Sequence, residues 1–68
     1  MTVIINGKKT NTAEDVTLVT LLRENGITKD TAGVAVAVNS SVIPRSEWND
    51  VRLSDGDMVE VIHAVQGG

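Results

Sequence analysis

A run near the middle of the chain, Val34-Ala35-Val36-Ala37-Val38, sets the strongest limit on the fold. Successive side chains of a β-strand point to opposite faces of a sheet, so the valines share one face and the alanines the other. Because both faces are apolar, this strand belongs in the interior of a sheet. We expect the larger valine face to be turned towards the core.

Other segments predict strands on either side of this run. Val3-Ile4-Ile5 is β-branched, and Asn6-Gly7 after it favours a two-residue type I′ hairpin turn into a more polar strand near residues 8–12. Residues 59–65 alternate as a strand does, after a tight turn at Asp55-Gly56-Asp57. The sequence therefore predicts an antiparallel hairpin early in the chain and a further strand late in it.

One helix is predicted between these strands. Leu18, Leu21 and Leu22 fall at positions i, i+3 and i+4 and form one apolar stripe. Thr17 can cap the start of this helix, and Gly26 sits where a helix C′ residue is expected. The result is a short amphipathic helix of about three turns at most.

The segment after the central strand predicts a turn and a short edge strand. Asn39-Ser40-Ser41 has the composition of a turn, and Pro44 limits Val42-Ile43 to a short strand at an edge. Residues 45–50 should be irregular, with a helical turn that packs Trp48. The order strand, strand, helix, strand, short strand, strand predicts an α+β domain with one helix across one sheet face.

Composition excludes several classes of function. The 68 residues include no cysteine, so iron–sulfur ligation, a ferredoxin-type site and a side-chain thiol are excluded. A net charge of −3 and the absence of Phe and Tyr argue against nucleic acid as a partner. No apolar stretch approaches the ~20 residues of a membrane span, so no membrane partner is expected. We expect a cytoplasmic protein.

Few side chains could carry out chemistry. His63 is the single histidine and, without a second metal-ligating side chain beside it, is interpreted as structural. Asp55 and Asp57 lack the remaining ligands of a calcium loop and are interpreted as turn residues. We therefore expect no catalytic residues and no metal site.

Two surfaces are candidates for binding a partner. Ala35 and Ala37 would leave a smooth patch of small residues on the sheet face away from the helix, or they would simply pack tightly under a loop. The acidic side chains of Asp55, Asp57 and Glu60 would steer a basic partner, or they would belong to a solvated turn.

The sequence ends in Val65-Gln66-Gly67-Gly68. Residues without a Cβ atom fit a slot too narrow for a side chain, and residues 66–68 in extended form would project roughly 10 Å. The alternative is an ordinary frayed terminus. Because no other plausible reactive group was found, Gly68 is the candidate for chemistry.

The pattern as a whole resembles the ThiS family of sulfur carriers, along essentially the whole chain. The resemblance is carried by the segments Asn6-Gly7, Thr17-Leu18, Leu21-Leu22, residues 34–39, Val42-Ile43-Pro44-Arg45, Trp48, Leu53, Asp55-Gly56-Asp57, Val59-Glu60-Val61 and residues 65–68. It implies a ubiquitin-like β-grasp domain over residues 1–65, with a mixed sheet of four to five strands. It also implies a flexible tail over residues 66–68.

The resemblance further implies a function in which this chain is a co-substrate and not an enzyme. A ThiF-like adenylating enzyme would use ATP to activate the Gly68 carboxylate, and a sulfur donor protein would convert it to a thiocarboxylate. A ThiG-like thiazole synthase would then receive the sulfur. Gly67, Gln66 and Val65 would be recognised as the tail, and no cofactor would be bound by the chain itself.

Three other functions remain open from the sequence. The small subunit of molybdopterin synthase has the same fold and ending, but it is typically longer and richer in aromatic residues. A ubiquitin-like modifier would instead join Gly68 to a lysine. A passive β-grasp interaction module would work without Gly67 and Gly68.

Overall fold

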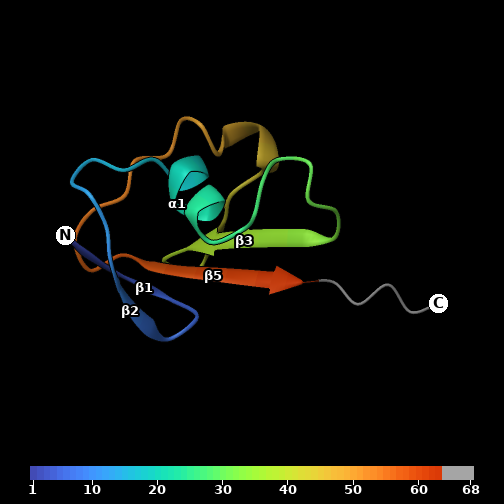
Figure 1. Cartoon of the computed structure of the whole chain (residues 1–68). Coiled ribbons are helices and arrows are strands. Elements are labelled where there is room, and N and C mark those ends of the chain that lie inside the picture. The colour runs from blue at the N-terminus through green and yellow to red at the C-terminus, as the bar shows by residue number, and fades with distance from the viewer. Residues whose placement is uncertain (64–68) are drawn as a thin grey trace.

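The computed structural model describes residues 1–63, and its elements follow the predicted order (Figure 1). They are β1 (Thr2–Ile5), β2 (Lys8–Asn11), α1 (Leu18–Glu24), β3 (Val34–Val38), β4 (Ser41–Val42), the 3-10 helix η1 (Arg45–Glu47) and β5 (Met58–His63). Residues 64 and 65, predicted to continue the last strand, lie outside the described residues. None of the helices described is long and apolar enough to cross a membrane.

The strands form one mixed sheet in the order β2-β1-β5-β3-β4, with α1 on one side of it (Figure 1). The first and last strands are parallel neighbours, with Ile4 opposite Met58 and Ile5 opposite Val59. The other pairs are antiparallel. The predicted β-grasp arrangement and the interior position of residues 34–38 are therefore confirmed.

Local signals set the two ends of α1. The Thr17 hydroxyl accepts a hydrogen bond of 3.3 Å from the Thr20 amide, as an N-cap residue does. At the other end Gly26 has a φ of 83°, and the amides of Gly26 and Ile27 donate to the carbonyls of Arg23 and Leu22. This pair of bonds is the Schellman motif, which satisfies carbonyls left over at the helix end.

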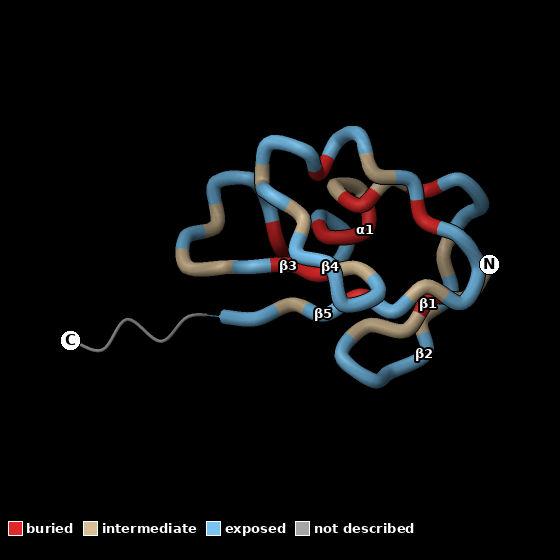
Figure 2. Tube along the Cα trace, turned by 180° about the vertical axis from the view of Figure 1, so that it is seen from behind, coloured by how far each residue is buried: buried red, intermediate tan, exposed pale blue. Residues whose placement is uncertain are grey.

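The core lies between α1 and the sheet, where Figure 2 shows most of the buried positions. Leu18, Leu21 and Leu22 of the helix are at most 2% exposed and meet the inward-facing residues Val3, Val36 and Val59 of three neighbouring strands. Trp48, which follows η1, is 1% exposed, and its Nε1 donates to the Ile43 carbonyl at 3.1 Å. The predicted packing of Trp48 by a helical turn is confirmed.

Two tight turns join antiparallel strands. Asn6 and Gly7 have φ angles of 49° and 82° between β1 and β2, and Asn39 and Ser40 have 48° and 71° between β3 and β4. Positive φ at both central residues is the signature of the type I′ turn, whose twist matches that of the strands. The predicted turns are therefore both present.

Candidate functional site

The residues expected to carry the chemistry lie outside the described part of the chain. Gly68, Gly67, Gln66 and Val65 all fall within residues 64–68, and their predicted roles remain predictions. The described structure reaches His63, the last residue of β5, which pairs with Val34 of β3. The candidate site is therefore the end of β5 together with the sheet face beside it.

The His63 side chain is exposed and lies on the helix side of the sheet. It shares that face with Val59 and Val61, as the alternation predicted, and the three line a groove of about 210 Å³ with Leu22 and Ile27. Within residues 1–63 no group of three or more His, Cys, Asp or Glu side chains is arranged to hold a metal ion.

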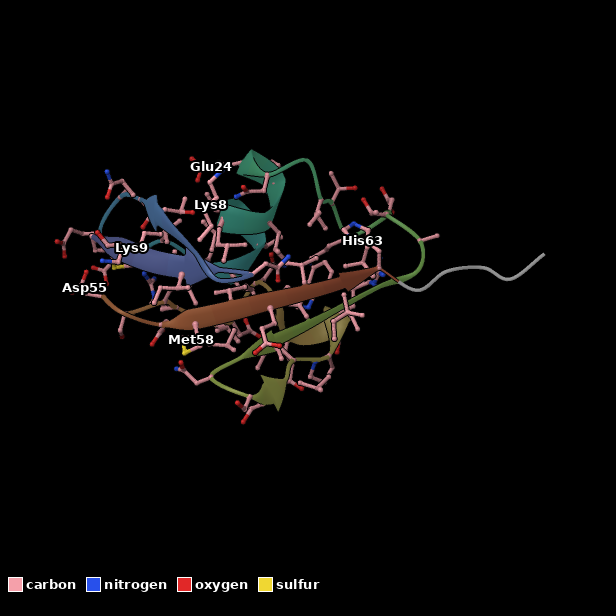
Figure 3. All side chains as sticks on the ribbon, turned by 90° about the horizontal axis from the view of Figure 1, so that it is seen from below. Lys8, Lys9, Glu24, Asp55, Met58 and His63 are labelled. Atoms are coloured by element: carbon pink, nitrogen blue, oxygen red, sulfur yellow. The ribbon has the colours of Figure 1, made fainter. Side chains whose placement is uncertain are left out.

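The opposite side of the sheet carries no helix, and Figure 3 views the molecule from that side. Cross-strand register shows which side chains lie on this surface, because residues directly opposite each other share a face. Lys9 of β2 is opposite Ile4 and lies at one edge of it. We give the name outer face to seven of the other side chains, which are Ile4, Ala35, Ala37, Val42, Met58, Glu60 and Ile62.

The outer face differs from the smooth alanine patch that was one of the two alternatives for Ala35 and Ala37. Ala35 is exposed, but Ala37 is only 8% exposed, because it lies between the larger side chains of Glu60 and Val42 on the neighbouring strands. The valines of β3 do turn towards the helix as predicted. The small alanine side chains therefore lie low on the outer face, and the larger side chains beside them project above them.

The outer face carries three exposed apolar side chains that the sequence interpretation did not single out. Val42 is 73% exposed, Ile62 57% and Met58 49%, and these are the large exposed apolar residues of the described chain. Strand alternation could have identified two of them, because Val59 in the core and Val61 packed against it place Met58 and Ile62 on the other side. Their grouping is typical of a surface that contacts another protein.

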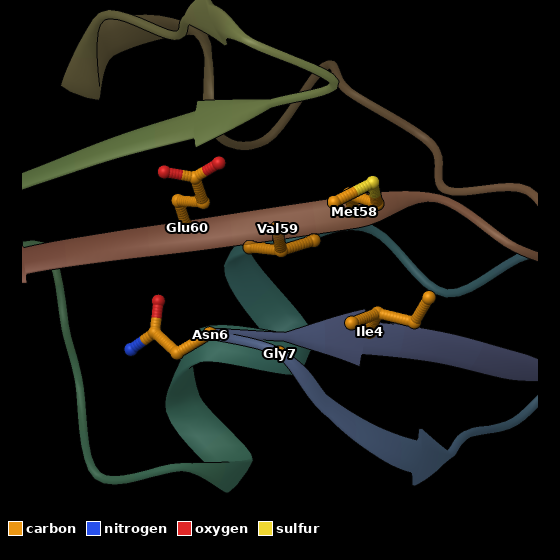
Figure 4. Close-up of a pocket in the computed structure, with 6 residues that line it drawn as sticks. All are labelled: Ile4, Asn6, Gly7, Met58, Val59 and Glu60. Atoms are coloured by element: carbon orange, nitrogen blue, oxygen red, sulfur yellow. The ribbon is translucent and has the colours of Figure 1, made fainter.

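A shallow depression runs along the outer face between β1 and β5. It has a volume of about 220 Å³ and is lined by Ile4, Asn6, Gly7, Met58, Val59 and Glu60. Figure 4 shows Met58 and Glu60 along β5 and the Asn6 amide beside that strand, beyond the end of β1. The depression thus combines apolar side chains with one exposed carboxylate and one amide.

Asp55 and Asp57 lie at the other end of the sheet from His63, as the Asp55 and His63 labels in Figure 3 show. The Asp55 carboxylate accepts a bond of 2.8 Å from the Thr2 amide, and Asp57 accepts one of 2.8 Å from the Ser54 amide. Their interpretation as turn residues is confirmed. Of the three acidic residues expected to steer a partner, only Glu60 lies on the outer face.

The described residues contain no buried polar or charged side chain. Acid, base and nucleophilic groups of enzymes are commonly activated by burial and by close partners. The described part of the chain therefore presents exposed surface and a strand end, with its interior given over to apolar packing.

Comparisons with known proteins found a matching family model and two curated relatives. The sequence model of the ThiS family matches residues 3–68. A thiazole synthase of Paramagnetospirillum magneticum (strain ATCC 700264 / AMB-1) is 35% identical over all 68 residues, which make up 20% of that protein. The sulfur carrier protein ThiS of Escherichia coli (strain K12) is 35% identical over 37 residues, 54% of this chain and 56% of that protein.

Solved structures give the same result for the fold. The crystal structure of a thiamine biosynthesis protein (ThiS) from Geobacter metallireducens superimposes with a TM-score of 0.84 at 28% identity, covering 100% of both chains. A solution structure of a thiamine biosynthesis protein from Geobacter metallireducens gives a TM-score of 0.78 and 88% coverage of that chain. The matched segments span about a fifth and about half of the two curated relatives.

Proposed function

The chain belongs to the ThiS family, and we propose that it is a sulfur carrier protein of thiamine biosynthesis whose reactive group is the Gly68 carboxylate. The observation that carries this proposal is the family match itself, which extends from the first strand through Gly68. In this function the folded domain is the part that partner proteins bind, and those partners carry out the chemistry on the Gly68 carboxylate.

The reaction requires activation because a terminal carboxylate is ionised at neutral pH and does not react with nucleophiles. A ThiF-like partner transfers AMP from ATP to the carboxylate and releases pyrophosphate. Hydrosulfide released by a sulfur donor protein then attacks the carbonyl carbon, so that a C–S bond forms, the bond to AMP breaks, and the products are the thiocarboxylate, AMP and a proton. The thiocarboxylate finally gives its sulfur to the thiazole under construction.

A thiazole synthase is the partner that the comparisons favour. In the Paramagnetospirillum relative, a segment similar to this whole chain makes up a fifth of a protein named thiazole synthase. A carrier and the enzyme that consumes its cargo gain effective concentration when they are joined. This chain would reach an equivalent enzyme by docking.

The outer face is the surface we assign to docking. Val42, Met58 and Ile62 supply exposed apolar area there, and Glu60 supplies a charge at its centre. Apolar contacts at the centre of an interface contribute most of the affinity, while a charge selects the partner. The outer face and the end of β5 are adjacent, so one partner can cover the face and receive the chain end.

Intact-mass spectrometry tests the proposal. Incubation with ATP, a ThiF-like enzyme of demonstrated activity and a sulfur donor should replace one oxygen by sulfur, and fragmentation should place the change at Gly68. Transfer to a thiazole synthase should then restore the original mass. A mass that stays unchanged in the first step would refute the function. Covalent adducts with lysine side chains would indicate a protein modifier instead.

A further inference from the structure

The link between β1 and β5 is completed by a side chain. The Asn6 amide donates to the Val59 carbonyl at 2.9 Å as the last backbone bond from this end of β1, and the chain then turns away at Gly7. The Asn6 side chain continues the ladder: its Oδ1 accepts from the Val61 amide at 2.8 Å and its Nδ2 donates to the Val61 carbonyl at 3.3 Å. One carboxamide thus takes the place of the next peptide group along β1, and Figure 4 shows the Asn6 side chain beside β5.

The two bonds from Asn6 lie close to the end of β5. Val61 lies two residues before His63, where the described strand ends. On the other side of β5, the pairing with β3 extends through Val34 opposite His63. The end of β5 is therefore held by backbone pairing on one side and by the Asn6 side chain on the other.

The other type I′ turn also places an asparagine against β5. Asn39 has the same place in the second type I′ turn, with a φ of 48° against 49° for Asn6. Its side chain also reaches β5, accepting from the Met58 amide at 3.0 Å and donating to Asp57 at 3.1 Å. The two asparagines hold opposite ends of one strand, and only Asn6 holds the end that leads to Gly68.

We propose that Asn6 is a positioning residue, which fixes the direction in which the chain leaves the sheet towards Gly68. This inference rests on the proposed function of Gly68. A carbonyl that must meet AMP and then sulfur in a partner's active site reacts only from a narrow range of positions, and small displacements there lower the rate steeply. Loss of the Asn6 carboxamide should therefore lower kcat for thiocarboxylate formation much more than it raises KM, because the apolar side chains and Glu60 of the outer face are kept and only the Asn6 end of the depression beside them changes.

Three variants test this role. Asn6→Gly keeps a residue suited to positive φ and removes both bonds to Val61, while Asn6→Asp retains the acceptor for the Val61 amide. Asn39→Gly is the matched control, since it removes two side-chain bonds at the far end of β5, one to the Met58 amide and one to the Asp57 carboxylate. Each variant is compared with the unchanged protein by amide hydrogen exchange at Val61 and by steady-state kinetics with the adenylating enzyme and sulfur donor.

Asn6→Gly should raise the exchange rate of the Val61 amide about fivefold or more and lower kcat about tenfold with KM within twofold. Asn6→Asp keeps the acceptor for the Val61 amide but puts an oxygen in place of the donor to the Val61 carbonyl, so it should recover part of the exchange protection and part of kcat. Asn39→Gly should leave the Val61 exchange rate and kcat near those of the unchanged protein. Equal kcat values for Asn6→Gly and Asn39→Gly, or a loss seen only in KM, would overturn the positioning role. Absence of thiocarboxylate in the unchanged protein would instead overturn the proposed function. The hydrogen exchange measurement does not depend on that function, and an unchanged Val61 exchange rate in Asn6→Gly would refute the contribution of Asn6.

Discussion

The guanidinium carbon of Arg45 lies 5.1 Å from the centre of the Trp48 ring. The same guanidinium donates through Nη1 to the carbonyls of Lys29 and Thr31, the latter at 2.7 Å, and through Nη2 to Val34 at 3.3 Å. Val36 uses its carbonyl to bind Ile43 of the following segment, so the Val34 carbonyl points to the same edge of β3. Arg45 thus closes that edge and ties the segment between α1 and β3 to the core.

Arg45→Lys should destabilise the fold by about 1–2 kcal/mol, because an ammonium group cannot hold three carbonyls of fixed geometry and also stack on an aromatic ring. Urea unfolding measures this change, with the single, buried Trp48 as its fluorescent reporter. Arg52→Lys is the control, since Arg52 makes one contact of 3.4 Å with the Asp15 carbonyl, and it should change the free energy of unfolding by less than about 0.5 kcal/mol. Equal losses in the two variants would contradict the role of Arg45.

Much of the fold was predictable because its signals are local. The cap at Thr17, the positive φ at Gly26 and the turn at Asn6-Gly7 depend on residues within one turn of the chain. The bond from Asn6 to Val61 joins residues 55 positions apart, and nothing near Asn6 in the sequence indicates it. The same holds for the covering of Ala37, which depends on the strands that became its neighbours.

Ser40→Gly should stabilise the protein by about 0.5–1 kcal/mol, because Ser40 has a φ of 71°, where a Cβ atom costs about 1 kcal/mol or more. The gain is reduced by the greater freedom of glycine in the unfolded chain. Ser41→Gly is the control, since Ser41 lies in β4 opposite Val38, and this change should destabilise. Urea midpoints measure both, and a loss of stability in Ser40→Gly would show that the turn does not carry this strain.

Ile62→Lys should weaken docking without weakening the fold. Ile62 is 57% exposed on the outer face, so the free energy of unfolding should change by less than about 1 kcal/mol. Loss of this apolar contact from the docking surface should raise KM for adenylation about tenfold. Ala13→Lys is the control, an exposed apolar residue outside the sheet, and it should leave KM unchanged. Equal KM values for the two variants would place docking elsewhere.

Changes at Gly67 and Gly68 test whether the stability of the folded domain is independent of the reactive chain end. Every buried core side chain of residues 1–63 lies at or before Val59, so neither deletion of Gly68 nor Gly67→Val should alter the urea unfolding curve. Deletion of Gly68 should abolish thiocarboxylate formation. Gly67→Val keeps the terminal carboxylate and adds a β-branched side chain, which should lower kcat/KM about a hundredfold if the partner's slot admits only a bare backbone. Mass spectrometry of the product measures both, and full activity of Gly67→Val would show that the slot is wide and that recognition depends on other residues.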